Sequence, residues 1–350
     1  AILKASRRLR ALAVIQIYLV VVSLFVSIPI YYFFKESGII PVIVLMAFVG
    51  MIVTMLYSYR FYPLRLRGVN GILGEGMGMI RLGVAFTLAG IFGSGAEMII
   101  RAYLNVSSDL CTVGLYNAGF MLTITYAGMV FSAMETDYFP RLSAINHDTP
   151  AVNTTVNRQI EVSVLLLSPM LSVFMLSLPI LLPLLYTDSF LPVVAMAQAA
   201  SFSMYFKSVY LPVSYIVLAK GESVAFLVLE ALSYMFLVIF VIVGYSSYGL
   251  FGTGIALSLS NLLDLILAFL YAGFRYRYFP SWHVLRYSSV QLALGLSAYA
   301  ITFVSDLLLY CVLGTIVCLA SAAYSIHILR RKTTLWDALM KRVAGKIGRK

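Results

Sequence analysis

Charged side chains interrupt several long apolar stretches of this chain, and they are the residues best placed to do chemistry. Glu97 and Arg101 lie four residues apart, so a helix would place them on one face. Lys207, Glu230 and Asp264 lie within three further apolar stretches. A charge inside a membrane span is costly and usually faces the interior of a helix bundle or a water-filled cavity. These five residues are therefore candidates for a polar site inside a membrane.

The two cations are suited to binding an anionic group. The guanidinium of Arg101 can bind a phosphate through two parallel hydrogen bonds, and Lys207 would supply a second positive contact to the same headgroup. Arg101 could equally pair with Glu97 and extend to the outer interface. Lys207 could instead be a structural partner of Asp264 or Glu230.

Three other polar residues have two open interpretations each. Asp264 and Glu230 could be proton or cation sites in an antiporter-like cycle, or they could simply pair between helices. Gln198 could hydrogen-bond to hydroxyl groups of a substrate, and a packing role is equally open. Prolines within residues 161–186 bend that segment, either to allow gating motions or for packing alone. They are Pro169, Pro179 and Pro183.

The composition places the chain among multispanning membrane proteins. Of its 350 residues 61% are hydrophobic and 11% are charged, whereas soluble domains have about 45–50% apolar and ~25% charged residues. The net charge of +11 does not indicate nucleic acid, because the charges lie in loops and at both ends, next to the apolar stretches. The three cysteines form no metal-binding pattern, no ATP-binding loop is present, and we expect no cofactor.

Ten apolar segments are near the ~20 residues that a membrane-spanning helix needs. They cover about 11–34, 39–59, 85–104, 113–134, 161–186, 191–218, 223–244, 250–273, 288–304 and 307–328. If the first residues are cytoplasmic, nearly every Lys and Arg between spans falls on the cytoplasmic side, and so does the C-terminus. The expected fold is an all-α, multi-pass bundle with very short outer loops, which leaves no room for an extracellular catalytic domain.

Residues 81–142 carry three short motifs in a fixed order. The first is Glu97-Met98-Ile99-Ile100, the second runs from Val113 to Ala118, and the third is Phe139-Pro140-Arg141-Leu142. This order and spacing resemble the polysaccharide flippases, among them O-antigen flippases, of the multidrug/oligosaccharidyl-lipid/polysaccharide exporter superfamily.

The resemblance implies a bundle of two six-helix lobes joined by a cytoplasmic connection. Here 1–59 would be the last two helices of the first lobe, 60–81 the linker, 82–278 the second lobe and 279–330 an added helix pair. The remaining residues, 331–350, predict a basic amphipathic cytoplasmic tail, for which a disordered basic tail is the alternative. On this layout the first four family helices are absent, and the chain is expected to be a fragment.

The resemblance also implies a function. Such a protein moves undecaprenyl-pyrophosphate-linked oligosaccharide across the bacterial inner membrane by alternating access, without being an enzyme. Its partners would be that lipid-linked substrate, membrane lipids and glycan polymerase or ligase machinery. One alternative is a cation-coupled drug exporter of the same superfamily, which favours acidic cavity residues. Another is a membrane glycan polymerase or acyltransferase, which needs catalytic clusters on loops that this sequence lacks.

Overall fold

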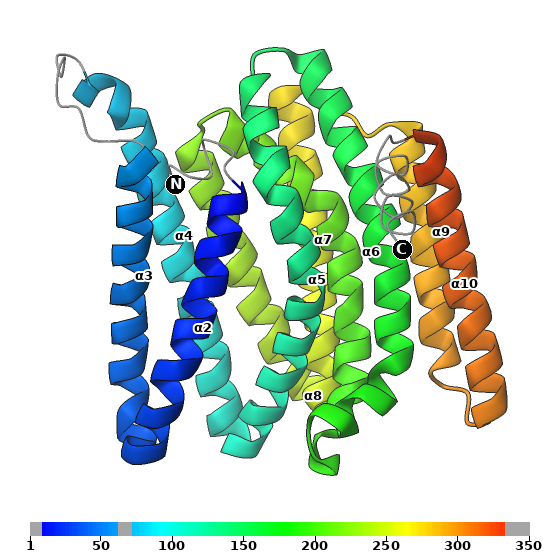
Figure 1. Ribbon diagram of the computed structural model, residues 1–350. Helices are drawn as coiled ribbons and strands as arrows, with labels where there is room; N and C mark the ends of the chain where they lie inside the picture. The colour runs from blue at the N-terminus through cyan, green and yellow to red at the C-terminus, as the bar shows by residue number, and fades with distance from the viewer. Residues whose placement is uncertain (1–8, 62–71, 333–350) are drawn as a thin grey trace, which may run out of the picture. The chain divides into compact units, whose positions relative to one another are not determined.

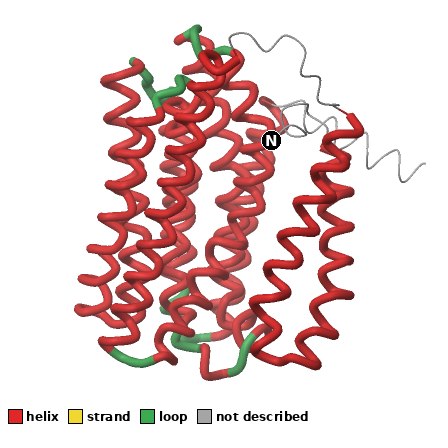
Figure 2. Tube along the Cα trace, turned by 90° about the vertical axis from the view of Figure 1, so that its left-hand side faces the viewer, coloured by secondary structure: helices red, strands yellow, loops and turns green. Residues whose placement is uncertain are grey.

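The computed structural model describes residues 9–61 and 72–332, and every regular element in those ranges is a helix (Figures 1 and 2). The chain divides into two compact units, Ala1–Glu75 and Gly76–Lys350. The boundary falls inside the linker predicted at 60–81. The multi-pass helical architecture expected from composition is confirmed.

The first unit contains a helical hairpin. Helix α2 spans Leu9–Phe34, the 3₁₀ turn η1 spans Lys35–Gly38, and α3 spans Ile39–Phe61. The tight turn reverses the direction of the chain, and the two long helices pack against each other. They correspond to the spans predicted at 11–34 and 39–59.

The second unit is a bundle in which α7 packs against more helices than α10 does. It packs against α5, α6, α8 and α9, and α10 packs on the outside against α6 and α9 (Figure 1). The elements are α4 (Ile72–Ser107), α5 (Leu110–Ala144), α6 (Thr149–Leu185), η2 (Asp188–Phe190), α7 (Val193–Ala219), α8 (Ser223–Tyr276), α9 (Trp282–Ile301) and α10 (Leu307–Lys332).

Helix α8 is a hairpin of two arms. Its 54 residues are interrupted at Gly249, whose φ of +60° suits a residue without a side chain. Near the turn, the backbones of Gly244 and Gly252 touch. At the open end, Glu222, just before the first arm, forms an ion pair with Arg275 near the end of the second arm. Oε1 of Glu222 lies 3.0 Å from Nη2 of Arg275. The two predicted spans at 223–244 and 250–273 are therefore the two arms.

Ten helical segments in the described ranges match the ten predicted spans. Eight helices are long and apolar enough to cross a membrane. The second arm of α8 adds a ninth segment, and α9, with 20 residues, adds a tenth outside those eight. The largest differences from the predicted boundaries are at the start of α4, the end of α5 and the start of α6.

Two stretches predicted as linker or polar connection are largely helical. Helix α4 begins at Ile72, inside the predicted linker, because isolated glycines lower helix stability by only about 1 kcal/mol each and do not stop a helix. Residues 136–160, which lie between the predicted spans at 113–134 and 161–186, are mostly the end of α5 and the first turns of α6. Hydropathy reports the hydrocarbon boundary, whereas the backbone hydrogen bonds continue beyond it. The predicted basic tail at 331–350 begins within α10, which ends at Lys332. The rest of the tail, 333–350, and residues 1–8 lie outside the described residues.

The hairpin in α8 predicts a contrast between two glycines of the same helix. A methyl group on Gly252 would collide with the backbone carbonyl of Gly244, whereas a methyl group on Gly273 would meet only Tyr278 O at 3.7 Å. We expect Gly252→Ala to destabilise the protein by about 1–3 kcal/mol. Gly273→Ala should be neutral or stabilising by up to about 1 kcal/mol. Thermal unfolding of both variants in detergent checks this, and equal midpoints would contradict the hairpin geometry.

Candidate functional site

A cavity of about 220 Å³ lies inside the second unit, between α4, α5, α7 and both arms of α8. Its wall combines charged, hydroxyl, amide and apolar side chains. The lining residues are Glu97, Phe120, Thr123, Ile124, Ser203, Met204, Lys207, Tyr210, Glu230, Ser233, Tyr234, Leu237, Leu257, Ser260, Asn261 and Asp264. A cavity with a partly polar wall therefore lies among helices that are long and apolar enough to cross a membrane.

Four of the six residues singled out from the sequence line this one cavity. They are Glu97, Lys207, Glu230 and Asp264, contributed by α4, α7 and the two arms of α8. The α8 hairpin brings Glu230 and Asp264 together although they are far apart in sequence. Oδ1 of Asp264 is buried and has no hydrogen-bond partner among the described residues.

Lys207 is the cation of this cavity. Its Nζ lies 5.6 Å from the ring centroid of Phe131, close enough for a cation–π interaction. No carboxylate oxygen of the described residues comes within 4.0 Å of that Nζ. Glu135, outside the cavity lining, and the cavity residues Glu230 and Asp264 act on this ammonium group electrostatically. None of them is paired with it, so an incoming anion does not have to break an ion pair to reach it.

Several neutral polar residues of the cavity were not picked out from the sequence. Tyr210 donates its hydroxyl to Oδ1 of Asn261 at 3.0 Å, which links α7 to the second arm of α8. Ser203 and Ser260 each precede a cavity charge, Lys207 or Asp264, by four residues. Residues at that spacing share a helix face. A serine one turn before Lys207 and another one turn before Asp264 were therefore the sequence signal that could have identified these lining residues.

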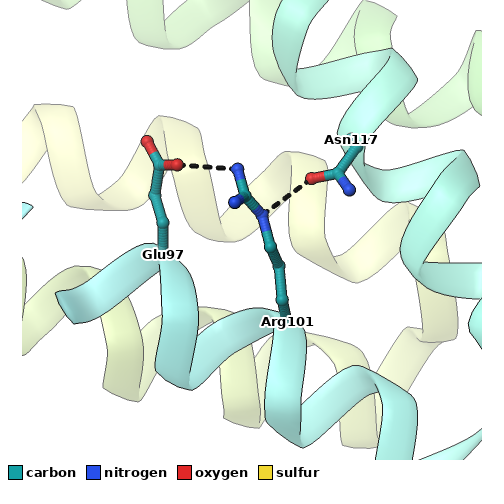
Figure 3. A network of polar contacts seen from close by, with 3 residues as sticks. All are labelled: Glu97, Arg101 and Asn117. Carbon is teal, nitrogen blue, oxygen red and sulfur yellow. Dashed lines mark hydrogen bonds and ion pairs between the residues drawn. The ribbon is translucent and has the colours of Figure 1, made fainter. Parts of the chain in front are cut away.

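Arg101 is held by two partners and does not line the cavity. Its Nη2 contacts Oε2 of Glu97 at 2.7 Å, and its Nε donates to Oδ1 of Asn117 at 2.9 Å (Figure 3). Asn117 belongs to the motif Val113–Ala118, so that motif joins the start of α5 to the end of α4. Of the two interpretations of Arg101, this structure contains the pairing with Glu97.

Gln198 is also separate from the cavity and has a backbone partner. Its Nε2 donates to the carbonyl oxygen of Met175 at 3.1 Å. Pro179, four residues after Met175 in α6, has no N–H to offer that carbonyl. Gln198 therefore satisfies a hydrogen bond that the proline removes from the helix, which is the packing role left open by the sequence.

No group of three or more His, Cys, Asp or Glu in the described ranges is arranged to hold a metal ion. The carboxylates of the cavity are spread over several helices. The chemistry that the cavity offers on its own is the binding of polar or charged groups.

Comparison with protein families gives a match over residues 1–195, to the model described as polysaccharide biosynthesis protein. The chain belongs to the polysaccharide biosynthesis protein family. This family matches the resemblance inferred from the motifs within 81–142. Comparison with curated proteins gives no significant match in sequence.

A solved structure similar to this family member is the lipid II flippase MurJ in an inward closed conformation. The two share 16% sequence identity with a TM-score of 0.51, over 88% of this chain and 66% of that one. The chain therefore spans about two thirds of the length of that structure. At this identity the similarity supports a common fold.

The pairing of Gln198 with a proline-freed carbonyl predicts a non-additive double substitution. Gln198→Leu alone should destabilise the protein by about 1–3 kcal/mol, because the Met175 carbonyl is left buried without a donor. In a Pro179→Ala background the new N–H can bond that carbonyl, so the cost of Gln198→Leu should fall. Unfolding midpoints of the two single variants and the double variant measure this coupling; additive effects would contradict the assignment.

Proposed function

We propose that the protein moves a lipid-linked oligosaccharide from one leaflet of a membrane to the other. Membership of the polysaccharide biosynthesis protein family and the fold similarity to a lipid II flippase support this function. The proposed substrate is an undecaprenyl-pyrophosphate-linked oligosaccharide in a bacterial inner membrane, with both termini of this chain cytoplasmic. The protein is proposed to be a transporter and not an enzyme, and polymerase or ligase machinery would use the product.

The observation that carries the proposal is the position of Lys207. It is the one cation among the described lining residues of an intramembrane cavity that also offers hydroxyl and amide groups. A pyrophosphate would bind the ammonium group, and sugar hydroxyls would hydrogen-bond to groups such as Tyr210 and Asn261. The lipid tail would remain in the bilayer while access to the cavity alternates.

The carboxylates would control the charge of the cavity during the cycle. Glu230 and Asp264 are proposed to take up a proton or cation when the substrate leaves. Without the substrate the cavity lining has three carboxylates and one ammonium group, and this net negative charge is costly in a poorly solvated site. Arg101 would act on the site through Glu97, which it contacts and which lines the cavity. Substrate contact by Arg101 itself requires that this pair opens.

A cation-coupled drug exporter is the second candidate. The observation that favours it is the acidic character of the cavity, in which Glu97, Glu230 and Asp264 outnumber Lys207. A cationic drug would bind the carboxylates directly.

The direct experiment deletes the gene in its own host and measures the lipid-linked oligosaccharide pool and the surface polysaccharide. Accumulation of the lipid-linked intermediate with loss of surface polymer supports the flippase. Unchanged pools with raised drug sensitivity would instead identify the exporter. Lipid-linked units that reach the outer leaflet without being polymerised would identify an enzyme.

Complementation of that deletion tests Lys207. Lys207→Gln removes the charge, and we expect polysaccharide export to fall about tenfold or more, because loss of a buried charged partner costs about 2–5 kcal/mol. Lys35→Gln is the matched control, since Lys35 is exposed in the turn η1. Variant protein levels are compared by immunoblot. Full complementation by Lys207→Gln at normal protein levels would contradict the assigned role.

A further inference from the structure

A second cavity, which shares no lining residue with the cavity around Lys207, lies where α6 and α9 begin and α10 ends. It has a volume of about 380 Å³. Figure 1 shows α6, α9 and α10 side by side, in agreement with their packing contacts. Its described lining residues are Asn153, Thr154, Asn157, Arg158, Glu161, Val162, Leu165, Ser281, His283, Ile328 and Leu329.

The lining changes from polar to apolar along α6. All five lining residues up to Glu161 are polar, and from Val162 onward the lining residues of α6 are aliphatic. Leu165 belongs to a buried apolar cluster with Tyr287 and Ile328, which forms the far wall. A site with one polar and one apolar end fits an amphipathic ligand.

The change in polarity coincides with the edge of the hydrocarbon layer. Helix α6 has 37 residues and is about 55 Å long, whereas the hydrocarbon core is only about 30 Å thick. One end of α6 must therefore extend beyond the hydrocarbon core, and its first turns, which carry the polar lining residues, are the end that fits the headgroup level. Trp282, 74% exposed at the start of α9, is a residue of the kind that anchors a helix at this interface.

The polar end is fixed in place by hydrogen bonds. Oδ1 of Asn157 accepts from the Tyr278 hydroxyl at 3.0 Å and from the backbone N–H of Ser281 at 2.9 Å. Asn153 donates to the carbonyl oxygen of Arg277 at 3.2 Å. These bonds tie the connection between α8 and α9 to α6, so the cavity does not have to be assembled when a ligand arrives.

The polar end offers both a cation and an unused acceptor. Arg158 provides a guanidinium, which binds phosphate oxygens well. At the start of α9 the Val284 N–H donates to the Ser281 hydroxyl, and the N–H groups of Trp282 and His283 before it have no partner within the helix. Oδ1 of Asn153 is buried without a hydrogen-bond donor among the described residues. A buried acceptor of this kind is costly unless a donor reaches it.

We propose that this cavity binds a glycerophospholipid whose headgroup contains a hydrogen-bond donor. Its phosphodiester lies against Arg158 and the start of α9, its headgroup hydroxyl or ammonium donates to Asn153, and an acyl chain follows Val162 and Leu165. Phosphatidylglycerol and phosphatidylethanolamine have this chemistry. Phosphatidylcholine lacks the donor, and diacylglycerol lacks the phosphate. The site is independent of the function proposed above.

The test titrates the complete gene product, in detergent, with each of these lipids and counts bound lipid by native mass spectrometry. We expect phosphatidylglycerol and phosphatidylethanolamine to bind severalfold more tightly than phosphatidylcholine, and diacylglycerol not to bind. Equal binding of all four lipids would overturn the proposal. Equal binding of sn-glycerol 3-phosphate would show a soluble phosphate ester site and would also overturn it.

Variants separate the two ends of the site. Arg158→Gln should weaken phosphatidylglycerol binding about tenfold or more, whereas Arg141→Gln, at an arginine of α5 paired with Asp137 outside the cavity, should not. Val162→Trp fills the apolar end and should weaken lipid binding with Arg158 intact. Equal affinity of the Arg158→Gln and Arg141→Gln variants would contradict the assigned phosphate contact.

Discussion

Inside a membrane every polar group must find its partner within the protein, and this constraint organises the second unit. Arg101 has two such partners on α4 and α5, and Gln198 satisfies the Met175 carbonyl that Pro179 leaves without a donor. In both cases the polar side chain fixes two helices relative to each other. The cavity departs from this rule, because Lys207 has no carboxylate within ion-pair distance and one oxygen of Asp264 has no partner among the described residues.

This departure separates structural from functional polar residues. Polar groups that have partners stabilise packing, whereas polar groups without partners in a cavity can still bind a ligand. The α8 hairpin creates the difference, since its turn at Gly249 folds Glu230 and Asp264 back toward Lys207. Under the proposed function, the charged headgroup of the substrate would meet the ammonium group of Lys207 in this cavity.

Much of the fold followed from hydropathy and turn residues alone. The ten apolar segments correspond to ten helical segments, because the length of a span is set by the bilayer and glycine marks the α8 turn. The helix ends were less predictable. Hydropathy falls at the membrane surface, but α4, α5 and α6 continue past it through backbone hydrogen bonds that carry no hydropathy signal.

The site was predicted in part. Intramembrane charge alone identified Glu97, Lys207, Glu230 and Asp264, since a charge at that depth requires a polar environment. It could not distinguish these from Arg101, because the face that a side chain presents depends on where the neighbouring helix supplies a partner such as Asn117. The role of Gln198 depended on its proximity to a proline-bent turn of another helix, which only the packing of α6 against α7 defines.

The most direct test of the central claim is photo-crosslinking from the cavity in living cells. A photoreactive amino acid replaces Tyr234, which lines the cavity, and in a matched variant it replaces Tyr299, which packs in a separate apolar cluster. If the substrate passes through this cavity, a covalent adduct with lipid-linked oligosaccharide forms at position 234 and none at 299. An adduct at 299 alone, or at neither position while polysaccharide export continues, would contradict the claim that the substrate passes through this cavity.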